Sequence, residues 1–129
     1  MIASHALTGN DLRLADVWEV AVHRAPVALA DEARGQMDAA RAIVESAGEN
    51  TYGINTGFGR FVSESIPPEQ QEELQLRLLR SHACGVGEPY PPEVVRAAML
   101  LRANALAKGY SGARVGTVEL LIACLNRGV

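Results

Sequence analysis

The sequence predicts a mostly α-helical protein with about five helices and one short extended piece. Apolar residues recur at intervals of three and four along most of the chain, and glycines and prolines separate these periodic stretches. With 129 residues, of which 48% are hydrophobic and 21% charged, the chain has the size and composition of a single globular domain. One helical domain over residues 1–129 is therefore expected.

Capping residues and short alternating stretches organise the first part of the chain. The run Thr8-Gly9-Asn10-Asp11 is typical of a capping box and predicts a first helix that ends before Pro26. Val27 and Leu29 alternate with small residues and predict the extended piece. Asp31 can cap a second helix, which Gly48 can end in the left-handed conformation. The expected apolar faces are Leu14, Val17, Trp18 and Ala21 in the first helix, and Ala33, Met37, Ala40, Val44 and Ala47 in the second.

Three further helices follow from proline, glycine and apolar spacing. A third helix should begin at Ile66-Pro67-Pro68, since proline suits the first turn, and His82 should fall at or just beyond its end. The fourth, Glu93 to Lys108, is apolar nearly all round, is interrupted mainly by Arg96, Arg102 and Asn104, and needs partners on several sides. Ser111 can cap a fifth helix. The expected helix ends are Gly109 and Gly128, and the apolar face of the fifth helix is Val118, Leu121, Ile122 and Leu125.

The charge, the cysteines and the histidines of the chain argue against several function classes. The net charge is −3, and the arginines and Lys108 are scattered, which argues against nucleic-acid binding. No apolar run is long enough to span a membrane and no secretory signal is evident, so a cytoplasmic location is expected. Cys84 and Cys124 form no metal or redox motif and are expected to be buried thiols. His5 and His23 have no metal-ligand spacing and are expected to be surface or packing residues.

The stretch TYGINTGFGR, from Thr51 to Arg60, contains three glycines beside a tyrosine. The glycines do not match a dinucleotide-binding fingerprint, and no Lys-Ser or Lys-Thr pair follows Gly59 as a phosphate-binding P-loop requires. Tyr52 is a phenol that could exchange protons with a substrate, or it could simply be a packing residue. The residues alone leave both interpretations open.

Three ordered motifs carry a family resemblance. YGINTGFG from Tyr52 to Gly59, RSHACGVGEP from Arg80 to Pro89, and NALAKGYSGAR from Asn104 to Arg114 resemble successive motifs of the aromatic amino-acid ammonia-lyases, and especially of the histidine-specific members. The resemblance covers nearly the whole chain. It implies the multi-helical, L-aspartase-like fold of that family, with residues 1–129 as its N-terminal helical domain.

The resemblance implies a role for each of five residues. Tyr52 matches the loop tyrosine that acts as catalytic acid or base on the substrate amine or β-carbon. Gly53 and Gly57 are implied to act as loop hinges, and Gly59 to lie beside the substrate carboxylate. His82, with the serine before it, occupies the selectivity position, where a histidine can bind an imidazole substrate through either ring nitrogen.

The resemblance also implies a reaction, a prosthetic group and an assembly. Family members carry methylideneimidazolone, which forms from an internal Ala-Ser-Gly tripeptide, and this chain contains no such tripeptide. The chain is therefore expected to be an N-terminal fragment, inactive alone, of a cytoplasmic homotetramer that converts L-histidine to trans-urocanate and ammonia. Neither a metal, a nucleic acid nor a membrane is expected to take part.

Other functions remain open at this point. Lyases specific for tyrosine or phenylalanine and tyrosine aminomutases belong to the same family, and some of the aminomutases also resemble the Arg80 to His82 motif. A different class of function is a non-catalytic helical module that associates with a partner. The apolar helix around Met99 to Leu106 motivates it, because that surface must be covered or exposed.

Overall fold

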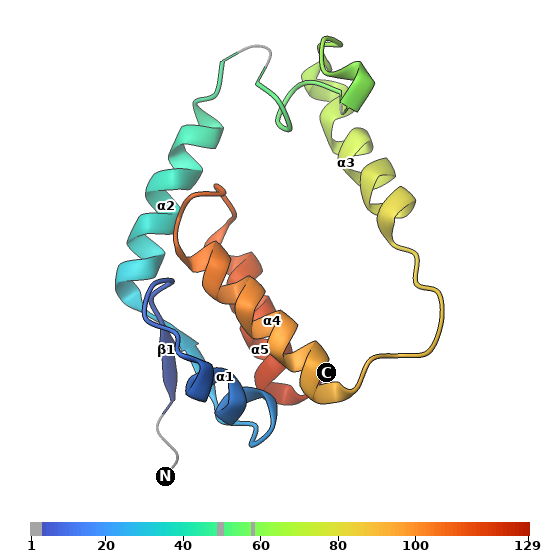
Figure 1. The fold of residues 1–129 in the computed structure, drawn as a ribbon. Coiled ribbons are helices and arrows are strands. Elements are labelled where there is room, and N and C mark those ends of the chain that lie inside the picture. Colours follow the sequence, from blue (N-terminus) through green and yellow to red (C-terminus); the bar gives the residue numbers. More distant parts are fainter. Residues whose placement is uncertain (1–3, 49–50, 58) are drawn as a thin grey trace. The chain divides into compact units, whose positions relative to one another are not determined.

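A computed structural model describes residues 4–48, 51–57 and 59–129 (Figure 1). Within these residues it contains five α-helices, one short 3-10 helix and two three-residue strands, so the prediction of a mostly α-helical fold is confirmed. The sequence suggested one domain, whereas the structure divides the chain into two compact units. Unit 1 comprises Met1–Ile43 and Pro89–Val129, and unit 2 comprises Val44–Glu88. No helix in the described part of the chain is long and apolar enough to cross a membrane.

Unit 1 contains a two-stranded parallel sheet. Strand β1 (His5–Leu7) pairs with β2 (Val27–Leu29) so that Leu7 lies opposite Leu29, and both leucines are buried. Helix α1 (Leu14–Ala21) connects them, because parallel strands require a crossover. β2 is the predicted extended piece. β1 was not predicted, since His5-Ala6-Leu7 lacks the two large apolar residues whose alternation indicated β2.

The side chain of Asn126 hydrogen-bonds to the edge of this sheet, as a neighbouring strand would. Its Oδ1 accepts a hydrogen bond from the Val27 N–H at 2.9 Å, and its Nδ2 donates to the Val27 carbonyl at 2.8 Å. The N–H and the carbonyl of Val27 both lie on the side of β2 that faces away from β1. One amide side chain therefore satisfies both backbone groups of Val27 on the open edge of β2, which would otherwise need water.

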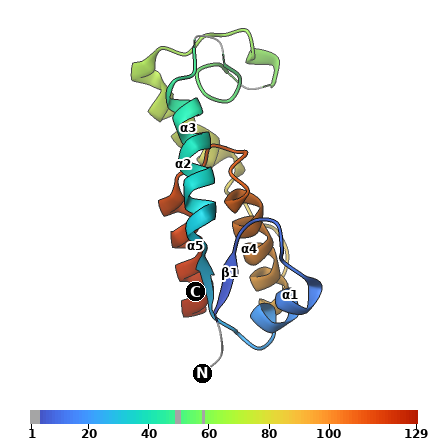
Figure 2. The same ribbon diagram turned by 90° about the vertical axis from the view of Figure 1, so that its left-hand side faces the viewer.

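Helices α4 (Pro92–Ala107) and α5 (Val115–Arg127) form an antiparallel pair in unit 1. They lie side by side in both views (Figures 1 and 2). Helix α4 also packs against α1 and β1, and α5 packs against β2, which confirms that α4 has partners on several sides. The buried core consists of Leu7, Val20, Ala25, Val27, Leu29, Ala33, Met37, Leu100, Ala103, Ala107, Val118, Ile122 and Leu125.

Arg96 is the charged residue on the buried face of α4, with 8% of its surface exposed. Its Nη2 and Nε donate to the Val20 carbonyl at 2.8 and 3.2 Å, and its Nη1 donates to the Leu125 carbonyl at 2.6 Å. Val20 and Leu125 lie in the last turns of α1 and α5, where backbone carbonyls lack partners within the helix. The guanidinium therefore joins two helix ends to α4, and its charge suits their dipoles.

Two helix starts differ from the prediction. Helix α1 begins with Arg13 as its N-cap, and Asp16 accepts a hydrogen bond from the Arg13 N–H at 2.8 Å. Thr8 instead bonds to the side chain of Asp11 within the preceding turn, so the predicted capping box is wrong. Helix α5 begins at Val115 rather than after Ser111. The left-handed backbone of Gly112, with φ of +64°, breaks the helix there.

Helix α2 (Asp31–Glu45) starts at the predicted residue but ends three residues before Gly48. Gly48 is not left-handed, so the predicted glycine cap is wrong. Gly109 does end α4 as expected, with φ of +72°. A Cβ on Gly109 would lie 2.7 Å from the backbone carbon and oxygen of Gln36, so α2 passes too close to this turn for any side chain.

We expect Gly109→Ala to destabilise unit 1 by about 2–4 kcal/mol. Alanine is strained in the left-handed backbone conformation of this residue, and its Cβ would clash with the backbone of Gln36. Gly35→Ala is the matched control in α2. A Cβ at Gly35 meets nothing within 4 Å, so that substitution should stabilise the helix by about 0.5–1 kcal/mol. Urea unfolding followed by the fluorescence of Trp18, the single tryptophan, reports on unit 1. Equal unfolding midpoints for the two variants would contradict the close approach.

Unit 2 contains the end of α2, a loop with the 3-10 helix η1 (Gly59–Phe61), and helix α3 (Pro68–His82). Helix α3 starts where the prolines predicted, with Pro67 as its N-cap, and no residue along it is buried. Cys84 follows α3 and is exposed, so the expectation that it is buried is wrong, while Cys124 in α5 is half-buried.

Candidate active-site loop

The predicted catalytic residue, Tyr52, lies in a hydrogen-bonded loop of unit 2, called here the Tyr52 loop, of which residues 48, 51–57 and 59–66 are described. The Gly48 carbonyl accepts hydrogen bonds from Thr51 Oγ1 and from Asn55 Nδ2, both at 2.9 Å. Asn55 Oδ1 accepts from the Thr51 N–H at 2.7 Å. Thr and Asn side chains commonly bond to nearby backbone in this way. These bonds hold residues 51–55 as a compact turn shortly after α2.

The second half of the Tyr52 loop returns to this turn as an antiparallel segment. Thr56 pairs with Ser65 as an isolated bridge. The Gly57 N–H donates to the Glu64 carbonyl at 3.0 Å, and the Ile66 N–H donates to the Asn55 carbonyl at 2.9 Å. These backbone bonds bring the two ends of the loop together, with η1 between them.

Tyr52 and two of the glycines lie on the accessible part of this loop. Tyr52 is 61% exposed. Its neighbour Gly53 has φ of +77° and Gly59 has φ of +58°, both in the left-handed region. A Cβ on either glycine would meet nothing within 4 Å, so backbone conformation rather than space favours glycine there. Gly57 differs, because it is buried as well as hydrogen-bonded. The hinge roles and the carboxylate contact stay predictions.

His82 lies at the opposite end of α3 from the Tyr52 loop. It is the last residue of the helix and is exposed, and the loop joins the first turn at Pro68. At 1.5 Å per residue, the helix places His82 about 20 Å along its axis from Pro68. The structure therefore puts the predicted catalytic and selectivity residues in the same unit, but at the two ends of one helix.

Local hydrogen bonds orient the His82 ring. Its Nδ1 lies 2.9 Å from the Leu78 carbonyl oxygen, one helical turn earlier, and 2.9 Å from Ser81 Oγ. Ser81 Oγ also lies 2.8 Å from the same carbonyl. The Ser81-His82 pair is recognisable in the sequence, whereas the contact with Leu78 is not, because a backbone carbonyl leaves no signal in the residue types.

The other two histidines are surface or packing residues, as expected: His5 is half-buried and His23 is exposed. His5 Nδ1 lies 3.6 Å from a carboxylate oxygen of Asp16. The His23 ring packs edge-on against Trp18, with 6.4 Å between ring centroids. In the part of the chain that the structure describes, no three His, Cys, Asp or Glu side chains gather as a metal site would require.

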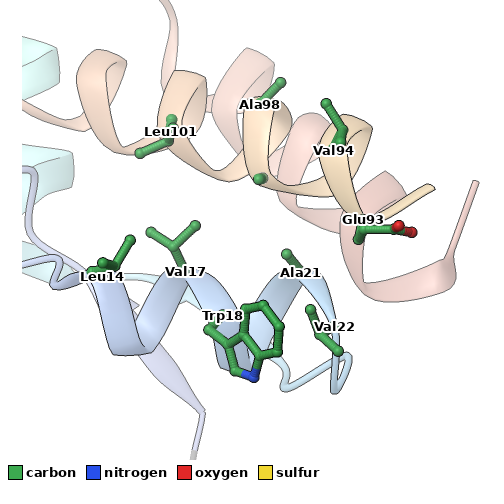
Figure 3. A pocket seen from close by; sticks show the side chains of 10 residues that line it. Leu14, Val17, Trp18, Ala21, Val22, Glu93, Val94, Ala98 and Leu101 are labelled. Carbon is green, nitrogen blue, oxygen red and sulfur yellow. The ribbon is translucent and has the colours of Figure 1, made fainter. Parts of the chain in front are cut away.

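An apolar groove of about 550 Å³ lies elsewhere, between α1 and α4 of unit 1 (Figure 3). Leu14 and Trp18 line one side and are 85% and 59% exposed, although both belong to the expected apolar face of the first helix. Val20 and Ala21 are the buried residues of α1 instead. Glu93 is the single charged residue of the lining, so the groove lacks the converging polar groups typical of an active site.

Comparison with known proteins identifies the family. A family profile described as aromatic amino acid lyase matches residues 12–129. The chain belongs to this family. Histidine ammonia-lyase from Geobacillus thermodenitrificans is 51% identical to this aromatic amino acid lyase chain over 126 residues, which are 95% of the chain and 25% of that protein.

Two solved structures are similar in fold to this chain. The ergothioneine-degrading enzyme ergothionase from Treponema denticola matches 98% of the chain with a TM-score of 0.91 and 32% identity. Tyrosine aminomutase from Streptomyces globisporus matches 98% of it with a TM-score of 0.86 and 31% identity. The chain covers 26% and 25% of these two structures. It thus spans about a quarter of the relatives that it matches.

Proposed function

We propose that the chain is the N-terminal part of a histidine ammonia-lyase, a carbon–nitrogen lyase that converts L-histidine to trans-urocanate and ammonia. The observation that carries this proposal is the 51% identity to a histidine ammonia-lyase, compared with 32% and 31% for the ergothionase and the aminomutase. The Ser81-His82 pair supports the same substrate, since its imidazole can hydrogen-bond another imidazole.

Within this function, Tyr52 exchanges a proton with the substrate, at the amine or the β-carbon, while the C–N bond breaks. Its exposure on a loop with fixed ends supports the role, because a substrate can reach the phenol. Gly53 and Gly57 adjust the loop, and Gly59 admits the substrate carboxylate close to the backbone. His82 binds the substrate side chain.

The electrophile of the reaction lies outside these residues. The chain contains no Ala-Ser-Gly and cannot form methylideneimidazolone itself. The described residues therefore supply proton transfer and substrate binding, and the prosthetic group belongs to the remaining three quarters of a family polypeptide. We propose that the complete protein is a cytoplasmic homotetramer. We also propose that its activity involves no metal ion, nucleic acid or membrane.

The complete polypeptide that contains this sequence should convert L-histidine to urocanate. Urocanate absorbs in the ultraviolet, so its formation can be followed continuously. The 129-residue chain should release none, because it lacks the electrophile. Ammonia release from tyrosine but not histidine by the complete polypeptide would contradict the proposed substrate. Turnover by the 129-residue chain would contradict the proposed division of the site.

A tyrosine aminomutase is the second candidate, supported by the TM-score of 0.86 over 98% of the chain. Product analysis separates the two, since an aminomutase yields a β-amino acid and retains the nitrogen. A non-catalytic association module is the third candidate, supported by the exposed groove of α1 and α4. Light scattering of the 129-residue chain tests it, because a monomer at all concentrations would count against self-association through that groove.

A further inference from the structure

The groove between α1 and α4 is lined by one apolar stripe from each helix (Figure 3). Each stripe follows the spacing i, i+3, i+4, i+7, which is the spacing of a helix face that packs against another helix. The stripes are Leu14, Val17, Trp18 and Ala21 on α1, and Val94, Ala97, Ala98 and Leu101 on α4. Two such stripes side by side form a groove suited to a third helix of at least two turns, about 12 Å long.

The side chains of this groove are accessible in unit 1. Val94 and Leu101 are 48% and 51% exposed, and they lie across from the exposed Leu14 and Trp18. Single exposed apolar residues are common, but a contiguous set over two helices marks a surface that binds another surface. Glu93 is the single charged residue of the lining. So apolar a lining is typical of a core divided between two parts of one polypeptide, because partners that also exist apart usually meet at more polar surfaces.

The last helix of the chain ends beside one end of this groove. Arg96 bonds to the carbonyls of both Val20 and Leu125, so the last turns of α1 and α5 lie next to each other. A Cβ on Gly128 would lie 3.2 Å from Nη1 of Arg24, which follows α1 by three residues. Residues that follow α5 therefore leave unit 1 next to the C-terminal end of α1, where the groove begins.

We propose that an apolar helix from the part of the polypeptide that follows Val129, in the same subunit, fills the groove between α1 and α4. This rests on the proposed function, which makes the chain the N-terminal part of a longer polypeptide. The chain covers 25% of the Geobacillus relative, so the rest of such a polypeptide is long enough to supply the helix. The covalent connection holds the helix at a high effective concentration, so it needs little affinity of its own.

This occupant accounts for the exposed stripe on α1. Leu14 and Trp18 belong to a regular apolar face, yet no element of the described residues covers them. In the complete polypeptide the two side chains are packed against the added helix. Unit 1 then gains an apolar contact that the 129-residue chain lacks.

Photo-cross-linking of the complete polypeptide identifies what fills the groove. In Trp18→p-benzoylphenylalanine a photoreactive ring replaces an indole that lines the groove. We expect mass spectrometry to find it joined to a peptide that follows Val129, in a band of single-subunit mass. Glu19→p-benzoylphenylalanine is the matched control, because Glu19 is exposed on the same helix outside the groove and should not link to that peptide. A band of twice the mass would place a second copy in the groove. That result, or the absence of any link beyond Val129, would overturn the proposal.

The labelling rate of a cysteine in the groove gives a second readout with a milder substitution. Leu101→Cys should react with a thiol reagent at least about 10-fold more slowly in the complete polypeptide than in the 129-residue chain, because a packed side chain reacts only after local opening. Arg102→Cys, exposed on α4 and outside the groove, should be slowed less. Mass spectrometry of separate peptides distinguishes these sites from Cys84 and Cys124. Equal rates for Leu101→Cys in the two chains, or equal slowing at both positions, would overturn the assignment to the groove.

The assay for urocanate separates this inference from the proposed function. A complete polypeptide that forms urocanate but shows no link from position 18 to the residues beyond Val129 would overturn the inference alone. A polypeptide that shows the link and forms no urocanate would overturn the proposed function and leave the filled groove standing. The two failures are therefore distinguishable.

Discussion

Tyr52→Phe should lower the kcat of the complete polypeptide for L-histidine by about 10²- to 10⁴-fold, the usual contribution of a positioned proton-transfer group. The substitution removes one hydroxyl from a side chain that is 61% exposed and leaves the ring in place. KM should change little, because the phenol acts on the reacting atoms more than on binding. Initial rates of urocanate formation measure both constants.

Tyr110→Phe is the matched control for Tyr52→Phe. Tyr110 is 90% exposed, lies in unit 1 and belongs to the turn between α4 and α5. Its loss of a hydroxyl should leave kcat within a factor of two or so of the original, as surface substitutions usually do. Full activity in Tyr52→Phe, with the same unfolding midpoint as the unmodified protein, would refute the catalytic role.

Arg96→Met should destabilise unit 1 by about 2–4 kcal/mol in urea unfolding monitored through Trp18. Methionine fills much of the same space but donates nothing, so the carbonyls of Val20 and Leu125 lose the donors that hold two helix ends. Unsatisfied buried carbonyls cost more than the net gain of an ordinary hydrogen bond. Arg96→Lys should be intermediate, because an ammonium keeps the charge but cannot span both carbonyls as the planar guanidinium does.

Arg102→Met, on the same helix but exposed, should change stability by less than about 0.5 kcal/mol. Burial lowers the pKa of Arg96, and the nearby Arg24 charge lowers it further. Arginine nevertheless stays protonated in proteins, so the difference between Arg96→Met and the original should be the same from about pH 5 to pH 8. A loss for Arg102→Met as large as that for Arg96→Met would indicate that helix α4 responds to charge removal rather than to the two carbonyls.

The fold was predictable where a long apolar stretch lies between residues that start and stop a helix. Helix α4 was expected from Glu93 to Lys108 and runs from Pro92 to Ala107, because sixteen residues bounded by proline and glycine leave little choice. The starts of α1 and α5 were not, since short polar residues can cap a helix or bond to one another in a turn. Thr8 does the second, and Ser111 precedes a left-handed glycine.

The candidate site was predictable in its residues but not in its arrangement. The loop motif locates Tyr52, and the structure adds the hydrogen bonds within the loop to the carbonyls of Gly48 and Glu64, which are backbone groups common to every residue type. The exposure of Trp18 could not be foreseen either. Spacing shows which residues share a helix face, but not which neighbouring element covers that face.

The bond between Asn126 and Val27 joins residues 99 positions apart, and it sets an order for folding during synthesis. Unit 1 is built from both Met1–Ile43 and Pro89–Val129, so its early strands have no completed edge until α5 leaves the ribosome. Contacts so distant in sequence form slowly, and strands that wait for them are exposed to other chains. In the nascent chain, β1 and β2 should therefore stay accessible to chaperones until Asn126 emerges from the ribosome.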